Sequence, residues 1–240
     1  MIRIFTSPEA VLPALADFIV SLSKVSIERE GRFNLVLSGG NSPKRLYELL
    51  ASTSYRNKIE WARVFFFFGD ERYVPPDHKD SNFLMVKNTL FDPLKIADDH
   101  VFGIDTSLPP AESAMAYENQ IRKHFANSCS FDLVLLGLGD NSHTVSLFPH
   151  TTVLHERKAL VKEIFVKEVN MYRITFTAPL INLAHAVTFL VYGESKAEAV
   201  HHILEDSPNV EEYPAQLIKP ENGELHWYLD TAAAARIKDN

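Results

Sequence analysis

The sequence predicts an α/β fold: a single domain over residues 1–240, with a doubly wound, mainly parallel sheet flanked by helices. The first observation is that short apolar runs typical of strands alternate with longer amphipathic segments typical of helices. The second is that some runs are unbroken, as in Phe65–Phe68, which indicates a strand buried on both faces of a sheet. The third is that no segment has the length or composition of a domain linker.

Three strands are predicted in the first part of the chain: Ile2–Phe5, Phe33–Leu37 and Val64–Phe68. A helix is expected from Ser7-Pro8 to about Glu28, because serine caps helices and proline is tolerated in the first helical turn. A second helix is expected to begin at Pro43, where leucines recur at helical spacing.

The rest of the chain continues the alternation. Helical spacing covers Ser81–Leu90, Ala111 to about Ala126, and Ser195 to about Leu204. The strands predicted here are Leu133–Leu136, Ala159–Val166, Arg173–Phe176, Val187–Tyr192 and Leu225–Leu229. Strands separated by helical segments are typical of βαβ units, which build a mainly parallel sheet.

The composition argues against several classes of protein. There are 24 Lys and Arg against 31 Asp and Glu, a net charge of −7, so no basic excess is available for nucleic acid. We recognise no signal peptide and no membrane-spanning run, and expect a cytoplasmic protein without a membrane partner. The single cysteine, Cys129, excludes an internal disulfide, suits a reducing compartment and is expected to be a bystander.

Five loops near predicted strand ends carry candidate functional side chains, and the first is a candidate anion site. Ser38, Gly39, Gly40, Asn41 and Ser42 follow a strand and lead into a helix. Glycines let the backbone approach a ligand closely, and a helix N terminus offers free N–H groups and a positive dipole end. The alternative is a tight turn with a helix cap. The lysine spacing does not fit a Walker loop.

The second loop places Asp70, Glu71 and Arg72 directly after a buried strand. The planar guanidinium of Arg72 could hold a carboxylate, a phosphate or a hydroxyl-rich ligand, with Asp70 in a supporting position. The alternative is an internal cluster of salt bridges. The acidic and histidine residues within 77–80 superficially suggest metal ligands, but a solvated loop is the better interpretation, and no metal site is expected.

The third loop contains the candidate general base, His143. It follows an apolar strand, at the end where α/β enzymes place their chemistry. Neutral imidazole is well suited to accepting a proton from water near pH 7. Asn141, Ser142 and Thr144 could orient the ring through their polar groups. The alternatives are a core histidine satisfied by hydrogen bonds and a residue that starts a helix.

The last two loops each contribute a cation. Arg173 begins a strand, and Lys196 lies in the first turn of a helix, where positive charge is slightly unfavourable unless an anion binds nearby. Each could equally be an ordinary surface cation. The adjacent His201 and His202 show no convincing spacing for metal ligands.

Together, the five loops resemble the 6-phosphogluconolactonase family, which shares a fold with glucosamine-6-phosphate deaminase. The matching segments are SGGNSP, GDERYVPPDHKDSN, GLGDNSHTVSLFP, RITFT with Ile181-Asn182, and GESKA. The resemblance covers nearly the whole chain and implies a Rossmann-like, glucosamine-6-phosphate deaminase-like fold. It implies hydrolysis of 6-phospho-D-glucono-1,5-lactone to 6-phosphogluconate in the oxidative pentose phosphate pathway, with no metal or organic cofactor.

The resemblance also implies residue roles. His143 corresponds to the proton-transfer residue, and Arg72 is expected to face the substrate. Residues 39–42 correspond to the phosphate loop, with Arg173 and Lys196 as cationic phosphate contacts.

Two positions depart from the family pattern. Asn141-Ser142 stand where the family usually has Asp-Gly, which removes a charge that could orient the imidazole and stabilise imidazolium. Ser42 stands where threonine is usual, and it retains the hydroxyl.

Two other functions stay open. One is deamination and isomerisation of glucosamine 6-phosphate on the same fold, although that pattern expects a different residue after Glu71 than Arg72. The other is a non-catalytic sugar-phosphate-binding protein. The expected partner is a small phosphorylated sugar lactone, and the expected assembly is a monomer or a small homo-oligomer.

Overall fold

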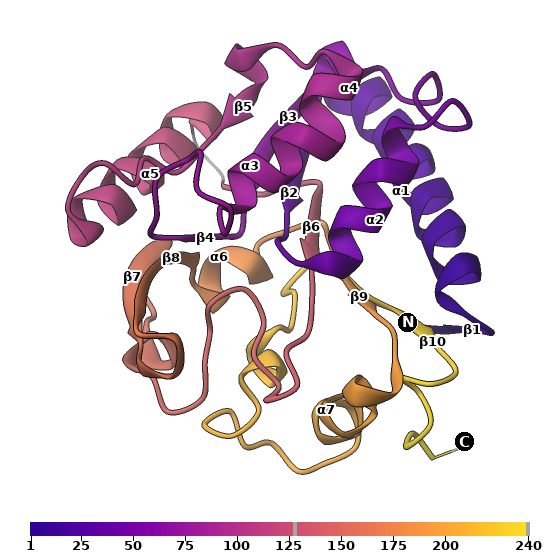
Figure 1. The fold of residues 1–240 in the computed structure, drawn as a ribbon, viewed down its shortest axis with the longest axis vertical. Helices are drawn as coiled ribbons and strands as arrows, with labels where there is room; N and C mark the ends of the chain where they lie inside the picture. The colour runs from indigo at the N-terminus through magenta and orange to yellow at the C-terminus, as the bar shows by residue number, and fades with distance from the viewer. Residues whose placement is uncertain (127–128, 239–240) are drawn as a thin grey trace.

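The computed structural model describes residues 1–126 and 129–238, and a seven-stranded parallel sheet forms its centre (Figure 1). The strand order is β1-β10-β9-β6-β2-β3-β5, with all neighbours parallel. The strands are β1 Ile2–Phe5, β2 Phe33–Leu37, β3 Val64–Phe68, β5 Val101–Phe102, β6 Leu133–Leu136, β9 Ala186–Val191 and β10 Glu224–Asp230. The predicted α/β class is confirmed. Strand β5 was not predicted, because two residues are too few to show a periodicity.

Helices cover both faces of this sheet. They are α1 Pro8–Glu30, α2 Asn41–Ala51, α3 Asn82–Val86, α4 Asp92–Leu94, α5 Pro110–Phe125, α6 Ala178–Asn182 and α7 Ala197–Leu204. Alternate residues of a strand point to opposite faces, so β2 contributes to two cores. Leu35 and Leu37 join the core under α1 and α2, whereas Val36 joins the core under α5, α6 and α7.

Several helix boundaries differ from those predicted. Helix α2 begins at Asn41, before Pro43, because Gly40 already serves as its N-cap. The helix predicted over Ser81–Leu90 is α-helical only to Val86 and continues as a π-helical turn, Lys87–Phe91. Short 3₁₀ turns occupy Trp61–Arg63, Asp98–His100, Thr152–His155, Lys167–Val169, Glu194–Lys196 and Pro214–Leu217.

A second, antiparallel sheet lies outside the main one, in the order β4-β8-β7. Its strands are β4 Asp70–Arg72, β8 Met171–Phe176 and β7 Val161–Val166. The sequence analysis treated β4 as a loop and did not separate the other two strands from the parallel sheet. Only a short turn joins β7 to β8, and a connection of that length permits antiparallel pairing alone.

Helix α1 is the one helix in the described part of the chain with the length and apolar composition to cross a membrane, which the sequence analysis did not anticipate. Its buried side chains, among them Leu15 and Ile19, join the core on one sheet face. The helix contacts β1, β2, β10 and α2. This packing accounts for its apolar composition.

The order of the strands creates a switch point between β2 and β6. The chain runs outward from β2 through β3 to β5, then returns to β6 and continues outward through β9 and β10. The pairing of β2 with β6 ends at Val36 opposite Val134, so the two strands separate at their carboxyl ends. Ligands of open α/β sheets bind in such crevices.

Candidate active site

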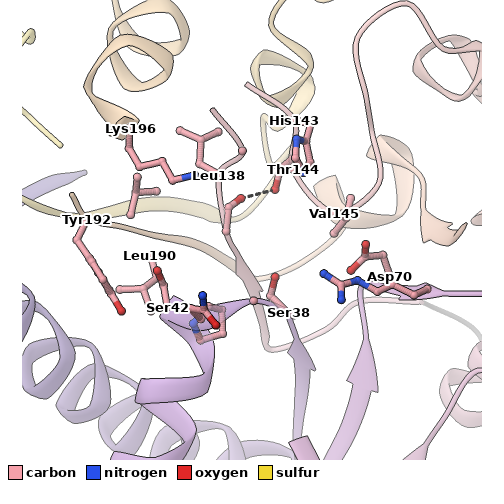
Figure 2. Close-up of a pocket in the computed structure, with 18 of the residues that line it drawn as sticks. Ser38, Ser42, Asp70, Leu138, His143, Thr144, Val145, Leu190, Tyr192 and Lys196 are labelled. Atoms are coloured by element: carbon pink, nitrogen blue, oxygen red, sulfur yellow. Dashed lines mark hydrogen bonds between the residues drawn. The ribbon is translucent and has the colours of Figure 1, made fainter. Parts of the chain in front are cut away.

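A cavity of about 360 Å³ lies at this switch point (Figure 2). The loops that surround it come from distant parts of the chain. The predicted site residues that line it are Ser38, Gly39, Gly40, Asn41, Ser42, Asp70, Arg72, His143, Arg173 and Lys196. Asn141 is exposed and lies outside the lining, but it contacts His143. The structure therefore brings residues of all five candidate segments to one place. Two of them come from strands rather than loops, because Arg72 on β4 pairs with Arg173, which lies within β8 and not at its start as predicted.

The loop after β2 points the N terminus of α2 at the cavity. Asn41 and Ser42 form its first turn, which contains no acidic side chain, and their N–H groups have no acceptor within the helix. Glycine at position 39 lets the loop pack closely against Asn82, because a Cβ atom there would lie 1.9 Å from Oδ1 of Asn82. These features make the end of the loop suitable for an anion.

The loop after β6 folds tightly around His143. The N–H of Gly139 donates to the His143 carbonyl at 2.8 Å, and a Cβ at Gly139 would lie 2.0 Å from the imidazole. The ring stacks on Phe148, with centroids 4.0 Å apart. Ser142 (φ 63°) and Val145 (φ 45°) have left-handed backbone, which is uncommon for such residues and often accompanies functional sites.

The imidazole of His143 is held as a neutral base. Its Nδ1 is hydrogen-bonded to Oδ1 of Asn141. Because an amide oxygen only accepts, the proton lies on Nδ1 and the lone pair on Nε2. The pKa of His143 is lowered to about 4, mainly by burial and also by the nearby charges of Lys196 and Arg173, against the opposing effect of Asp70. The ring is therefore uncharged at neutral pH.

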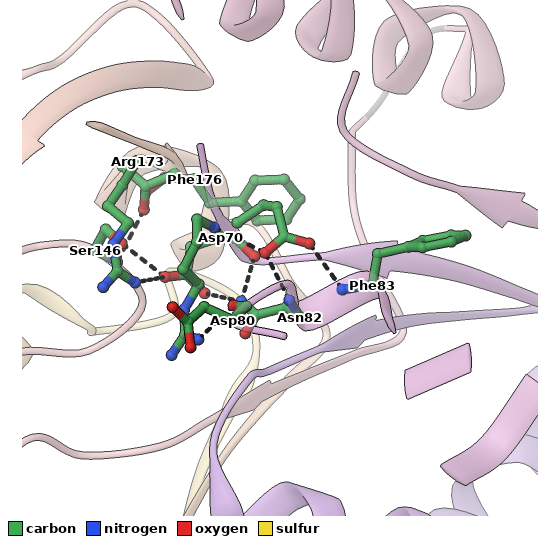
Figure 3. A network of polar contacts seen from close by, with 10 residues as sticks. Asp70, Asp80, Asn82, Phe83, Ser146, Arg173 and Phe176 are labelled. Atoms are coloured by element: carbon green, nitrogen blue, oxygen red, sulfur yellow. Dashed lines mark hydrogen bonds and ion pairs between the residues drawn. The ribbon is translucent and has the colours of Figure 1, made fainter. Parts of the chain in front are cut away.

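A polar network centred on Asp70 (Figure 3) forms the wall of the cavity that lies opposite Lys196. Ser146 Oγ donates to its carboxylate at 2.6 Å, and Asn82 Nδ2 donates at 3.2 Å. Arg173 Nη1 lies 4.0 Å from the same carboxylate. Among the described residues, neither Arg173 Nε nor Arg72 Nε has a hydrogen-bond partner, although both are buried. Both arginines line the cavity, so other N–H groups of their guanidiniums are available to a ligand there.

Glu71 anchors the segment that carries Arg72. Its buried carboxylate accepts hydrogen bonds from the N–H groups of Arg72, Asn82 and Phe83 and from Ser81 Oγ, at 2.7 to 3.1 Å. Burial raises its pKa, while the backbone donors oppose that change. The sequence analysis offered an internal salt-bridge cluster as an alternative here. The structure shows a carboxylate bonded mainly to backbone N–H groups.

Lys196 approaches the cavity from the loop after β9, on the side away from Asp70 (Figure 2). Its Nζ is 2.6 Å from Oδ1 of Asp140, which belongs to the His143 loop. The lysine side chain is half-buried, whereas Asp140 is largely exposed. The cavity is thus flanked by arginines on one wall and by a lysine on the other.

Comparison with known proteins identifies the family. Residues 6–227 match the family of glucosamine-6-phosphate isomerases/6-phosphogluconolactonase. The chain belongs to this family. It is 39% identical to a 6-phosphogluconolactonase from a Nostoc species over 98% of both chains, and 40% identical to one from a Synechocystis species over 94% of this chain and 92% of that protein.

A solved structure of a family member has the same fold. The 6-phosphogluconolactonase of Trypanosoma brucei aligns over 99% of this chain and 98% of its own, with a TM-score of 0.87 and 30% identity. The glucosamine-6-phosphate deaminase-like architecture predicted from the sequence is therefore shown.

Several residues that line the cavity of this chain were not predicted from its sequence. Leu138, Val145, Leu190 and Tyr192 line it, and they form an apolar surface between the polar walls. Apolar residues at strand ends resemble ordinary core residues in a sequence, so only Tyr192, directly before Gly193, gave a usable signal. Within residues 1–126 and 129–238, no three His, Cys, Asp or Glu side chains form a metal-binding group, the 77–80 segment included.

Proposed function

We propose that this chain hydrolyses 6-phospho-D-glucono-1,5-lactone to 6-phospho-D-gluconate, the second step of the oxidative pentose phosphate pathway. The observation that carries the proposal is the neutral His143 beside three cations in one cavity. A base and a set of anion contacts are what hydrolysis of a phosphorylated ester requires. The names of the full-length relatives support the same reaction.

In the proposed reaction, His143 acts as the general base. Its Nε2 accepts a proton from water as the water oxygen attacks C1 of the lactone. The hydrogen bond from Nδ1 to Asn141 holds the tautomer that this step needs. A lactone is an activated ester, so water activated by one base is a sufficient nucleophile.

The attack produces a tetrahedral oxyanion. Arg72 stabilises this charge, because its guanidinium lines the cavity and is held by the Asp80 carbonyl before the reaction. The intermediate collapses as the C1–ring-oxygen bond breaks, and protonated His143 returns its proton to the departing ring oxygen. The product is the open-chain acid, and the histidine is neutral again.

The phosphate is assigned to the N terminus of α2, Arg173 and Lys196. The α2 terminus supplies N–H groups, and the two side chains supply charge from opposite sides of the cavity. Holding the remote end of the sugar places C1 against His143 without chemistry at the phosphate. Lys196 must exchange its ion pair with Asp140 for the phosphate.

The proposed setting is the cytoplasm, where one cysteine without a disulfide partner is stable. The partner is the small phosphorylated lactone alone, and the assembly is a monomer or a small homo-oligomer. Size-exclusion chromatography with light scattering measures the assembly directly.

The reaction is tested by acid release from freshly generated 6-phosphogluconolactone, corrected for spontaneous hydrolysis. His143→Ala should lower kcat on the order of 10²- to 10⁴-fold, because it removes positioned proton transfer. His155→Ala is the matched control, since His155 is exposed, pairs with Glu211 and lies outside the cavity lining. A folded His143→Ala enzyme with near-normal turnover would overturn the assignment.

The same preparation separates this function from the two alternatives. The family includes glucosamine-6-phosphate isomerases, so ammonia release from glucosamine 6-phosphate is measured in parallel. Ammonia release without lactone hydrolysis would favour that reaction. Binding of 6-phosphogluconate without faster lactone hydrolysis would favour a non-catalytic binding protein.

A further inference from the structure

Two buried tyrosines hold the ends of adjacent strands in the same way. Tyr47 Oη accepts a hydrogen bond from the N–H of Ser38 and donates one to the carbonyl of Ser38, both at 2.9 Å. Tyr117 Oη accepts from the N–H of Phe68 at 2.8 Å and donates to its carbonyl at 3.2 Å. Each hydroxyl therefore satisfies both backbone groups of a single residue.

The position of Ser38 explains why it needs such a partner. The pairing of β2 with β6 ends at Val36, so the crevice opens beside the residues that follow. Ser38 is only 5% exposed, and its N–H and carbonyl lie beyond the last sheet pair of β2. Buried backbone groups without hydrogen-bond partners are costly. Because Ser38 has no partner on β6, its N–H and carbonyl need hydrogen bonds from another group.

Tyr47 is suited to supply that substitute. It belongs to α2, the helix whose first residues, Asn41 and Ser42, line the cavity. Its side chain is fully buried. Burial raises the pKa of its hydroxyl, so the group stays protonated and keeps its ability to donate. Helix α2 thus has its N terminus at the cavity and is also hydrogen-bonded, through Tyr47, to the residue that follows β2.

Tyr117 occupies the equivalent position on the other sheet face. It lies on α5, and Phe68 directly precedes the segment that carries Asp70 and Arg72. The N–H of Gly69 bonds to the carbonyl of Leu37 at 3.0 Å, which links the two strand ends. Both loops therefore leave the sheet from residues that a tyrosine hydroxyl holds.

We propose that Tyr47 is a positioning residue that holds the 38–42 loop in its ligand-binding shape, and that Tyr117 positions the segment from Gly69 to Arg72. Neither hydroxyl touches the cavity, so each acts through the backbone of the loop it holds. The kinetic effects expected for these tyrosines rest on the proposed function, whereas their expected effects on the structure of the loops do not.

The kinetic test uses Tyr47→Phe, which removes only the hydroxyl. We expect KM for the lactone to rise on the order of tenfold with kcat within about twofold, because the 38–42 loop binds the end remote from C1. Tyr55→Phe is the control, since that hydroxyl bonds to Asp17 and lies outside the cavity lining. A purely structural role would lower thermal stability in both variants and leave KM unchanged, and that result would overturn the proposal.

Tyr117→Phe provides an independent second variant. Its expected effect is a fall in kcat rather than a rise in KM, because the segment it holds carries Arg72, the group assigned to the oxyanion. A kcat equal to that of wild type would overturn the assignment for Tyr117.

Hydrogen–deuterium exchange on unliganded protein supplies a readout that needs no activity. Tyr47→Phe should accelerate exchange of the Ser38 amide and of the amides that follow it, whereas Tyr55→Phe should not. If wild type fails to hydrolyse the lactone, the proposed function is wrong, and the exchange result alone decides this inference. Unchanged exchange at Ser38 in Tyr47→Phe would overturn it.

Discussion

The amide oxygen of Asn141 is hydrogen-bonded to the imidazole of His143, at the position where the family resemblance predicts an aspartate. An amide can fix the ring and its tautomer as a carboxylate does. It supplies no negative charge to stabilise an imidazolium. Asn141 can therefore orient the ring without supplying the charge that an aspartate would add.

Substitutions at Asn141 should distinguish those roles. We expect Asn141→Ala to lower kcat about 10- to 100-fold with little change in KM, because His143 loses its orienting partner. Asn141→Asp retains the hydrogen bond and adds charge, so its kcat should equal or exceed that of wild type. The measurement is the initial rate of acid release from the lactone. A wild-type kcat for Asn141→Ala would show that the ring is oriented without it.

The low pKa of His143 determines the expected pH dependence of activity. The base must be neutral, so kcat/KM for the free enzyme should fall on the acid side with a midpoint near pH 4. An unperturbed histidine would give a midpoint at about pH 6.5. Rates between about pH 3.5 and 8, with circular dichroism to confirm folding, measure this. A midpoint near 6.5 would contradict the burial-based explanation.

The same shift affects stability, with a defined sign. Between about pH 6.5 and 4, the unfolded chain binds a proton at His143 that the folded chain does not. The contribution of His143 therefore lowers the free energy of unfolding as the pH falls through this range. Above it both states are neutral at this residue, so the contribution no longer changes.

At the scale of elements, the cavity depends on close contact between the β2 loop and α3. Asn82, at the start of α3, packs over Gly39 and donates to the carbonyl and the carboxylate of Asp70. Glu71 accepts from the first N–H groups of the same helix. The helix thus connects the 38–42 loop with the segment that carries Arg72.

Replacing Gly39 by alanine should disrupt this contact. The new Cβ would lie 1.9 Å from Asn82 Oδ1, and Asn82 is held by Asp70 and cannot move freely. We expect a loss of about 1–3 kcal/mol in the free energy of unfolding, together with a higher KM. Gly103→Ala is the control, because its Cβ would meet the Phe83 ring at an ordinary 3.6 Å. Thermal or denaturant unfolding measures the stability of both variants. Equal stability of Gly39→Ala and Gly103→Ala would contradict the close packing of Gly39 against Asn82.

At the scale of the whole molecule, charge and topology act together. The chain has a net charge of −7, yet Arg72, Arg173 and Lys196 surround one cavity. An anionic substrate is therefore attracted locally, against the overall field of the protein. The strand order of the main sheet brings the loops after β2, β3, β6 and β9 to the same edge, and the pairing of β4 with β8 places Arg173 beside Arg72.

Local features of the sequence were sufficient for much of the fold. Unbroken runs such as Val64–Phe68 and Leu133–Leu136 identified central strands correctly, because burial on both faces leaves only apolar residues. Short strands were not predicted: the strand Val101–Phe102 was missed, and the strand Asp70–Arg72 was interpreted as a loop. Such strands have no periodicity of their own and form only because a neighbour is already in place.

The sequence by itself determined the α/β class, the central strands, the family resemblance and which side chains could do chemistry, because composition and periodicity are local properties. Only the tertiary structure decided the strand order, the separate antiparallel sheet and the bonds that hold the site. The hydrogen bonds of Tyr117 to Phe68 and the ion pair of Asp140 with Lys196 join residues 49 and 56 positions apart. The lowered pKa of His143 depends on burial and on charges from several loops, so this shift arises only when the chain has folded.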